Sequence, residues 1–183
     1  MNKKTEIKVS KFLSFALRHR PEEVGNELDE GGWADVPSVL EAAARNGYAV
    51  SLEELQQVVA NNDKKRFALS DDLGRIRASQ GHSVTVELGY TPGEPLELLF
   101  HGTVARFLGS IRTQGLLKGQ RQHVHLSAQE ATARNVGQRR GTPVLLQVRA
   151  LAMHHDGFAF YLSDNGVWLT ETVTPNYIVF PNE

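Results

Sequence analysis

The sequence predicts an α+β protein in two parts: a mostly helical first half that ends in a β-hairpin, and a second half of mixed strands and helices. Apolar residues in the first half recur at a spacing close to that of an α-helix, whereas those in the second half form short runs of strand length. A stretch rich in proline and glycine, residues 91–95, separates the two patterns. We therefore place a domain boundary between residues 92 and 93.

The first half is expected to contain three helices, because each has a start or stop signal. Side chains that cap helices precede two of the apolar patterns, and residues that interrupt helices follow two of them. The signals are Pro21 after a helix over 7–19, Asp35 and Gly47 around the second helix, and Ser51 with Glu54 as a capping box for a helix over 52–61.

A β-hairpin is expected after these helices. The short runs 66–69 and 75–78 flank a turn that contains two aspartates and a glycine. Three helices followed by a hairpin predict a winged-helix-like module for residues 1–92.

The second half is expected to fold as a sheet with helices packed on it. The strand candidates are 96–100, 124–126, 144–148, 158–161, 167–170 and 178–180. Helices are expected over 104–114, ended by Gly115, and over 128–136, with Ser127 as the N-cap.

Composition excludes several classes of function. The chain has no cysteine, so disulfides, thiolate metal sites and a cysteine nucleophile are excluded. No apolar run approaches the roughly 18 residues of a membrane helix, and we expect a soluble, cytoplasmic protein. The net charge of −1 disfavours a protein that wraps long polyanions. Residues 91–183 nevertheless contain seven Arg and one Lys, which suits a local phosphate site because arginine binds phosphate in a bidentate way.

Candidate functional residues of the first half lie at the ends of its elements. Arg18 and His19 end the first helix, where a basic pair is also favoured by the helix dipole alone. Arg66 follows two lysines and precedes an apolar strand; it is the best candidate of that basic run to point inward, although such runs are usually solvated. The loop Gln80 to Ser83 follows the hairpin and supplies hydrogen-bonding groups.

In the second half, His101-Gly102-Thr103 is expected to close a strand and open a helix. The backbone N–H groups of such a junction can bind an anion, and the alternative is a capping turn with Thr103 as the N-cap.

The run from Arg121 to Ser127 is expected to form a strand with Arg121, His123 and His125 on one face. A metal site made of His101, His123 and His125 is the rival interpretation. The absence of an acid from this run and the neighbouring arginine disfavour that site.

Taken together and in order, these motifs resemble the NAD-dependent RNA 2′-phosphotransferase family. The resemblance covers nearly the whole chain. The motifs that carry it are Leu17-Arg18-His19, Asp63-Lys64-Lys65-Arg66-Phe67, Arg77-Ala78-Ser79-Gln80-Gly81-His82-Ser83, His101-Gly102-Thr103, Arg121-Gln122-His123-Val124-His125-Leu126-Ser127 and Gly166-Val167-Trp168-Leu169.

The resemblance implies a fold and a set of site residues. It implies a winged-helix-like lobe over 1–92 that binds RNA phosphate and an ADP-ribosyltransferase-like lobe over 93–183 that binds NAD, with the active site between them. The implied catalytic residues are Arg18, His19, Arg66 and Arg121, and the implied NAD-binding residues are His101, Gly102, Thr103, His125 and Ser127. A further group is expected to contact RNA or to shape the cleft, namely Arg77, Gln80, His82 and His123.

The resemblance also implies the reaction, with NAD as a co-substrate and no metal. An internal 2′-phosphate of RNA attacks the nicotinamide ribose and expels nicotinamide. The 2″-hydroxyl of that ribose then attacks phosphorus, which gives 2′-OH RNA and ADP-ribose 1″,2″-cyclic phosphate. Spliced tRNA is the usual eukaryotic substrate of this family, and no obligate protein partner is inferred.

A late glutamate that many ADP-ribosyltransferases use is not found at Gly166-Val167-Trp168-Leu169, where the nearest acid is Glu171. This suits an acceptor that is already an anionic phosphate, and it would not hold if Glu171 lay in the site.

Two other functions stay open. An ADP-ribosyltransferase could stop after the first step, and a winged-helix protein could bind nucleic acid without catalysis. Residues 1–90 carry 12 Lys and Arg against 14 Asp and Glu, a net charge of −2, which disfavours the second.

Overall fold

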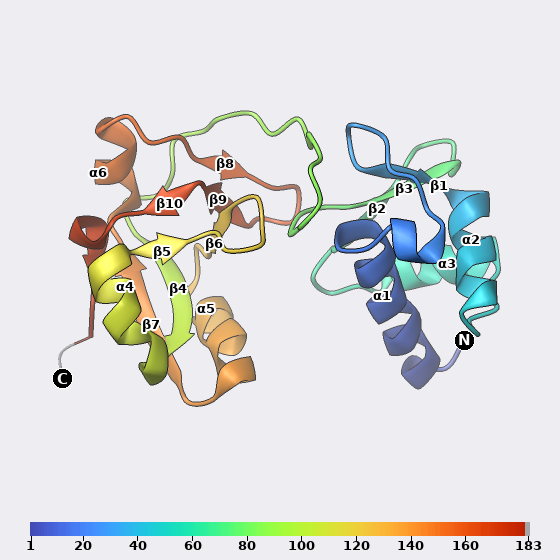
Figure 1. Cartoon of the computed structure of the whole chain (residues 1–183), viewed down its shortest axis with the longest axis horizontal. Coiled ribbons are helices and arrows are strands. Elements are labelled where there is room, and N and C mark those ends of the chain that lie inside the picture. The colour runs from blue at the N-terminus through green and yellow to red at the C-terminus, as the bar shows by residue number, and fades with distance from the viewer. Residues whose placement is uncertain (182–183) are drawn as a thin grey trace. The chain divides into compact units, whose positions relative to one another are not determined.

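The computed structural model describes residues 1–181 and shows an α+β protein with several small antiparallel sheets (Figure 1). The chain divides into two compact units, Met1–Gly89 and a second unit from Tyr90 onward. We call the first of these unit 1 and the second unit 2.

Unit 1 contains the three expected helices, α1 (Lys3–Arg18), α2 (Val36–Arg45) and α3 (Leu52–Ala60), and a 3-10 turn, η1 (Glu22–Val24). The first helix starts four residues before the expected position, because the side chain of Asn2 accepts a hydrogen bond from the backbone N–H of Thr5 and caps it.

The predicted starts of the other two helices of unit 1 are confirmed. The Asp35 carboxylate accepts a hydrogen bond from the Ser38 N–H at 3.0 Å and caps α2. Ser51 and Glu54 form the capping box of α3 in both directions.

The predicted hairpin of unit 1 is also confirmed, as β2 (Phe67–Leu69) and β3 (Arg75–Ala78). A strand that the sequence did not predict, β1 (Trp33–Asp35), pairs with the other edge of β3, so that the strand order is β1-β3-β2. This strand has only three residues and follows two glycines, so it lacks the length and alternation that identify a strand.

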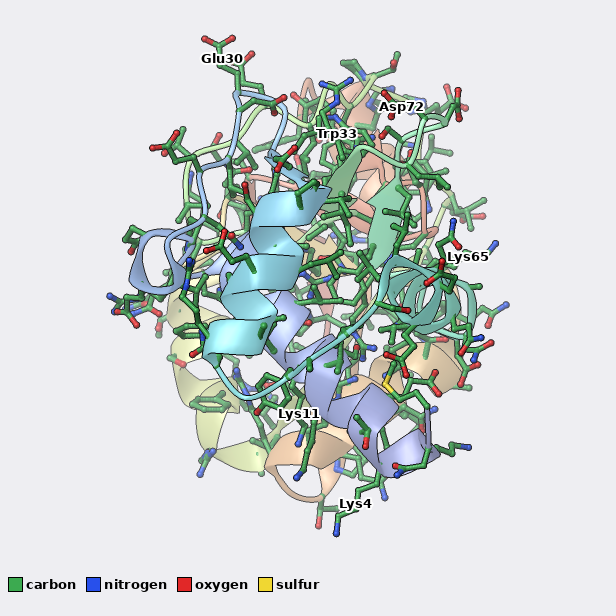
Figure 2. All side chains as sticks on the ribbon, turned by 90° about the vertical axis from the view of Figure 1, so that its right-hand side faces the viewer. Lys4, Lys11, Glu30, Trp33, Lys65 and Asp72 are labelled. Carbon is green, nitrogen blue, oxygen red and sulfur yellow. The ribbon has the colours of Figure 1, made fainter. Side chains whose placement is uncertain are left out.

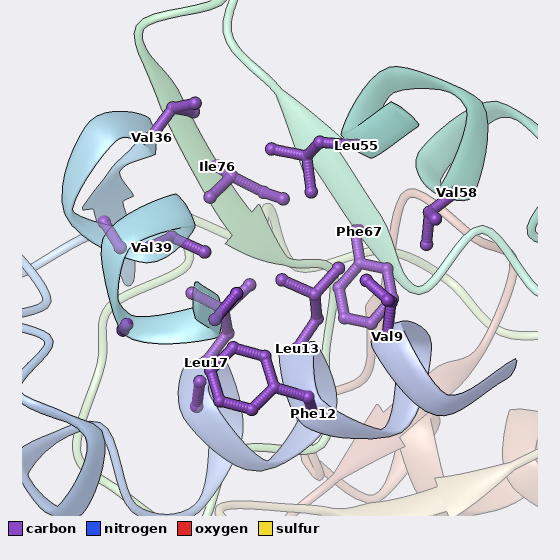
Figure 3. Packing of buried hydrophobic residues seen from close by; sticks show 14 of the residues in the cluster. Val9, Phe12, Leu13, Leu17, Val36, Val39, Leu55, Val58, Phe67 and Ile76 are labelled. Carbon is purple, nitrogen blue, oxygen red and sulfur yellow. The ribbon is translucent and has the colours of Figure 1, made fainter. Parts of the chain in front are cut away.

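The core of unit 1 lies between one face of this sheet and the three helices. Ile76 of β3 is fully buried, and Figure 3 shows its side chain directed toward the side chains of the helices, among them Leu13 and Leu55. Alternate residues of β3 point to opposite faces, so Arg75 and Arg77 lie on the sheet face away from this core.

Unit 2 is built on two three-stranded antiparallel sheets and one strand pair. The first sheet has the order β11-β7-β4 and the second β6-β9-β8. The strands are β4 (Leu99–Val104), β5 (Leu116–Leu117), β6 (Val124–Leu126), β7 (Pro143–Val148), β8 (Tyr161–Leu162), β9 (Trp168–Thr170), β10 (Thr172–Val173) and β11 (Ile178–Val179). An isolated bridge between Phe100 and Ser127 joins the two sheets, and β5 pairs with β10.

The helices of unit 2 agree less closely with the helices expected from the sequence. They are η2 (Ala105–Phe107), α4 (Leu108–Gln114), α5 (Glu130–Gly137), η3 (Gln138–Arg140), α6 (Ala150–His155) and η4 (Pro175–Tyr177). The expected N-cap at Ser127 is wrong: Gln129 takes that position, because the backbone of Ser127 pairs with Phe100 in the bridge between the sheets.

The core of unit 2 is a second, separate cluster of buried apolar side chains. Its largest members include Phe160, Leu99, Leu126, Leu146 and Met153. In the part of the chain that the structure describes, no helix has the length and apolar character needed to cross a membrane.

Candidate functional site

Two groups of arginine and histidine side chains stand out, one in each unit. The group in unit 1 begins at the C-terminal end of α1. A guanidinium N–H of Arg18 donates to the backbone carbonyl of Arg66 at 3.4 Å, and its guanidinium carbon lies 6.0 Å from the centre of the Phe67 ring. The fold therefore brings together two residues that are 48 positions apart in the sequence.

A turn with an unusual backbone directs Arg66. Lys65, the preceding residue, has a φ of +41°, in the left-handed region that non-glycine residues seldom adopt. The Asn62 side-chain oxygen accepts hydrogen bonds of 3.3 Å from the backbone N–H and from a guanidinium N–H of Arg66. On the far side, the Ser79 N–H donates to the Arg66 carbonyl at 2.8 Å. The side chain and the backbone of Arg66 are thus both fixed.

His19 is oriented by the loop that follows the hairpin. Its Nδ1 lies 3.0 Å from the Ser83 hydroxyl, and the Ser83 N–H donates to the Arg18 carbonyl at 2.9 Å. The loop from Gln80 to Ser83 is therefore held against the end of α1, where it orients the imidazole of His19.

His82, in the same loop, is 1% exposed. Neither of its ring nitrogens has a hydrogen-bond partner among the described residues. Burial lowers the pKa of His82 to about 4, and the charges of Arg18, His19 and Arg77 act in the same direction. His82 is therefore neutral at physiological pH. Of the two roles expected for it, its burial favours shaping the site over touching RNA.

The other expected residues of unit 1 lie nearer the surface. Gln80 is partly exposed. Arg77 is partly exposed as well, and its guanidinium carbon lies 4.6 Å from the centre of the Trp33 ring.

In unit 2, the expected structure of His101-Gly102-Thr103 is wrong. These residues do not form a strand-to-helix junction; they lie inside β4 and pair with β7 in regular register. The reason is Gly102, which sits against α5. A Cβ atom there would lie 1.7 Å from the Ala133 carbonyl oxygen, so this glycine allows the helix to approach the strand.

His101 is held by the neighbouring strand. Its Nδ1 lies 3.2 Å from the backbone carbonyl of His125, so Nδ1 carries the proton and Nε2 is left as an acceptor. Burial lowers the pKa of His101, and the charges of Arg140 and Arg121 add to this, although the hydrogen bond to His125 opposes them.

The expectation of a strand that carries Arg121, His123 and His125 on one face is wrong in part. Only His125 lies in β6, because the strand begins at Val124 and residues 121–123 form a bend. Arg121 still reaches His125: its Nη1 lies 2.5 Å from His125 Nδ1. A guanidinium can only donate, so Nδ1 of His125 is the acceptor and the proton of the neutral ring is on Nε2.

His123 turns away to an aromatic environment. Its ring centre lies 5.6 Å from that of Tyr161 and 6.5 Å from that of Tyr90, both in edge-to-face arrangements. Burial lowers the pKa of His123, the charge of Lys118 lowers it further, and that of Glu171 raises it. His123 is thus placed by packing.

Two functional candidates that sequence reasoning missed are Arg139 and Arg140 on η3. The pKa of Arg121 is lowered by partial burial and then by the charges of Arg140 and Arg139, so these two guanidinium groups are close enough to act on that of Arg121. The adjacent arginines before Gly141 were the available signal, but they lie 18 residues after Arg121 and nothing local connects them.

Glu171 lies at the surface between β9 and β10. Its side chain is 76% exposed, and one carboxylate oxygen is 2.7 Å from the ammonium group of Lys118. The Glu171 carboxylate is therefore engaged in an ion pair at the protein surface.

No group of three or more histidine, aspartate or glutamate side chains in residues 1–181 is arranged to hold a metal ion. His101, His123 and His125 are therefore not grouped as three metal ligands in the described residues.

Together these features define an α+β protein with two groups of arginine and histidine side chains, the composition expected of sites for phosphorylated ligands. A family model described as RNA 2′-phosphotransferase, Tpt1 / KptA family, matches residues 4–172. The chain belongs to this family.

Individual relatives agree along their whole length. A protein of Flavobacterium johnsoniae named probable RNA 2′-phosphotransferase is 55% identical over 180 residues, which cover 98% of this chain and 99% of the relative. Proteins of the same name from Rhodopirellula baltica and Pseudomonas aeruginosa are 55% and 54% identical, over 96% and 97% of this chain and 96% and 98% of their own.

Proposed function

We propose that this protein removes an internal 2′-phosphate from RNA by transferring it to NAD. Membership of the RNA 2′-phosphotransferase family supports the removal of the phosphate. The observation that carries the proposal is the hydrogen bond from the Arg18 guanidinium to the Arg66 backbone carbonyl, beside His19 in unit 1.

The arginines of unit 1 suit a phosphate dianion. A phosphomonoester carries a charge of about −1.5 to −2 at neutral pH, and planar guanidinium groups bind its oxygens in pairs. Arg18 and Arg66 lie together, and the bond to Asn62 orients the guanidinium of Arg66 before any ligand binds. An RNA 2′-phosphate would meet donors that are already in place, and Arg77 and Gln80 would assist from the hairpin and the loop.

The residues of unit 2 suit the anionic part of NAD. The charges of Arg139 and Arg140 act on Arg121, and a pyrophosphate near these residues would offset that repulsion. His101 presents an acceptor at Nε2 and His125 a donor at Nε2, which suits ribose hydroxyls and carbonyl groups. Gly102, Thr103 and Ser127 belong to the same proposal. Gly102 packs against α5 and Thr103 is buried, so these two residues are proposed to shape the NAD site from beneath.

The proposed reaction has two balanced steps. A 2′-phosphate oxygen forms a bond to C1″ of the nicotinamide ribose, and the bond to nicotinamide breaks. The 2″-hydroxyl then attacks phosphorus, the bond from phosphorus to the RNA 2′-oxygen breaks, and that oxygen receives a proton. Arg18, Arg66 and Arg121 are the proposed donors to the charge on the phosphoryl oxygens in the second step.

His19 is proposed to move a proton or to anchor phosphate in that second step. The contact of its Nδ1 with the Ser83 hydroxyl orients the imidazole, and Nε2 is the ring nitrogen proposed to act on the ligand. An imidazole that is fixed in this way can exchange a proton without reorienting.

The finer architecture belongs to the same proposal. Residues 1–92 form a winged-helix-like lobe for RNA, and residues 93–183 form an ADP-ribosyltransferase-like lobe for NAD. The protein acts on phosphorylated RNA such as tRNA in the cytoplasm, with no metal and no obligate protein partner.

An assay with purified protein tests this function. A short RNA with one internal 2′-phosphate is incubated with and without NAD and with no added metal, and the mass of the RNA is followed. Loss of phosphate only with NAD is expected. Alanine at Arg18, His19, Arg66 or Arg121 should abolish most of the activity.

The matched control for these variants is Arg45→Ala. Arg45 forms an ion pair with Glu41 on α2 and donates to the Val24 carbonyl, and neither partner belongs to the group of Arg18, His19 and Arg66, so its loss should leave the rate unchanged. Phosphate release without NAD, or a control as impaired as the four variants, would contradict the proposal.

A further inference from the structure

The outer face of the sheet in unit 1 carries a tryptophan flanked by two arginines. In the antiparallel register Trp33 of β1 lies opposite Arg77 of β3. The guanidinium carbons of Arg77 and Arg75 lie 4.6 Å and 5.5 Å from the centre of the indole. We call these three residues the Trp33 array; Figure 2 shows Trp33 beside the hairpin.

The array is not part of the core. The neighbours of its members along the strands, Ala34 and Ile76, are 2% and 0% exposed and face the helices, whereas Trp33 is partly exposed. The side chain of Arg75 is 56% exposed. A large aromatic side chain on an open sheet face, interleaved with cations, is the usual composition of a surface that binds single-stranded nucleic acid.

The array is also fixed before any ligand binds. One carboxylate oxygen of Asp29 accepts a hydrogen bond from the Trp33 N–H at 2.9 Å, and the other lies 3.6 Å from a guanidinium nitrogen of Arg75. Gly31 leaves room for the edge of the indole, because a Cβ atom there would lie 3.2 Å from its Cδ1 atom. One aspartate thus binds the backbone of Trp33 and the guanidinium group of Arg75.

A second acid beside the array, Asp35, already has partners of its own. Asp35 lies opposite Arg75 in the sheet register. One of its carboxylate oxygens accepts hydrogen bonds from the backbone N–H and the hydroxyl of Ser38 at the start of α2, at 3.0 Å and 2.8 Å. This carboxylate is engaged in the helix cap. The two arginines of the array together with Asp29 keep a formal charge of +1.

Arg77 extends the array toward the proposed phosphate residues. Gly32, the residue before Trp33, lies beside His82, because a Cβ atom at Gly32 would be 3.4 Å from His82 Nε2. The charges of Arg77, Arg18 and His19 all act on the pKa of this same imidazole. A nucleotide whose 2′-phosphate meets Arg18 would therefore place an adjacent nucleobase within reach of Trp33.

We infer that the Trp33 array stacks an unpaired nucleobase next to the 2′-phosphate, so that unit 1 selects single-stranded RNA. Nucleobases stack on aromatic rings and on guanidinium planes, and they can do so only where they are not held in a duplex. The inference rests on the proposed function and adds the form of the RNA that the enzyme accepts.

Binding of short RNAs to the full-length protein, without NAD, tests the inference. The background is Trp168→Phe, which leaves Trp33 as the one tryptophan and makes its fluorescence a report on stacking. The probe is a single-stranded RNA with one internal 2′-phosphate, compared with the same RNA with abasic nucleotides on both sides of it. Quenching of Trp33 by the first RNA and affinity roughly 5- to 100-fold weaker for the second are expected.

Variants separate stacking from simple packing. In the wild-type background, Trp33→Leu should weaken binding and raise KM to a similar extent with little change in kcat, and Trp33→Phe should restore much of the loss. The matched control is Phe180→Leu, which removes an aromatic ring that lies 4.4 Å from Arg112 in unit 2 and should leave RNA binding unchanged.

Equal affinity and equal quenching with the abasic RNA, or equal affinity for the same 2′-phosphate within a duplex, would overturn the inference. Parallel turnover with NAD distinguishes the two claims. Full NAD-dependent activity with no effect of the abasic sites defeats the stacking alone, whereas absence of that activity defeats the proposed function.

Discussion

Protonation of His82 is expected to destabilise unit 1 in mild acid. Its pKa in the folded protein is about 4, mainly because of burial, against about 6.5 for an exposed imidazole. Between these values the unfolded chain binds a proton that the folded chain does not, so stability falls as the pH is lowered through this window and the loss is complete below about pH 4.

The size of this effect follows from the shift. The full loss is about 3 kcal/mol, and about 2 kcal/mol of it should be present at about pH 5. Replacement by glutamine, which does not titrate, should remove this pH dependence, even though His82→Gln should also lower stability at neutral pH because it changes a side chain that is 1% exposed.

Urea unfolding at about pH 7.5 and about pH 5 measures the difference. Trp33 fluorescence in the Trp168→Phe background reports on unit 1. Wild-type protein should lose about 2 kcal/mol more than His82→Gln between the two conditions, and the control His155→Gln, at an exposed position on α6, should behave as wild type. Identical pH dependence in wild type and His82→Gln would refute the reasoning about the buried imidazole.

Three further changes have defined outcomes. Gly102→Ala should destabilise unit 2 by several kcal/mol and abolish activity, because the new Cβ atom would lie 1.7 Å from the Ala133 carbonyl oxygen; the melting temperature reports this, and a wild-type value would contradict the close packing of α5 on β4. Asp35→Ala should cost about 1 kcal/mol in urea unfolding through loss of the α2 cap, and no change would mean that the cap is not formed in solution. Glu171→Gln should leave turnover with NAD and RNA nearly unchanged, since this carboxylate is exposed and ion-paired; a large drop in kcat would place it in the catalytic site.

The elements of unit 1 could be predicted because their signals are local. Asp35 and the Ser51–Glu54 pair cap helices within four residues of themselves, so the sequence contains the whole interaction. The strand at Trp33 could not be predicted, because the strand with which it pairs, β3, lies about 40 residues later in the chain.

In unit 2, predictions from the sequence failed where tertiary contacts override a local pattern. His101-Gly102-Thr103 resembles a turn by composition, but its glycine is required by a helix that begins near residue 130. The bend at Arg121 breaks the expected strand, and the arginine reaches His125 through its side chain instead of through the strand face.

The sequence did not show how the candidate residues lie relative to one another. The adjacency of Arg18 and Arg66 follows from the packing of α1 against the hairpin, and no spacing in the sequence encodes it. The contribution of Arg139 and Arg140 became evident only from their electrostatic effect on Arg121.

The most direct test of the central claim is the fate of the phosphate. RNA carrying a radiolabelled internal 2′-phosphate is incubated with the protein and NAD, and the small products are separated and identified by mass. The proposed reaction predicts that the label moves into ADP-ribose 1″,2″-cyclic phosphate, and that the amount of this product equals the amount of nicotinamide released. Label recovered as free inorganic phosphate, or retained on RNA as a stable ADP-ribosylated product, would contradict it.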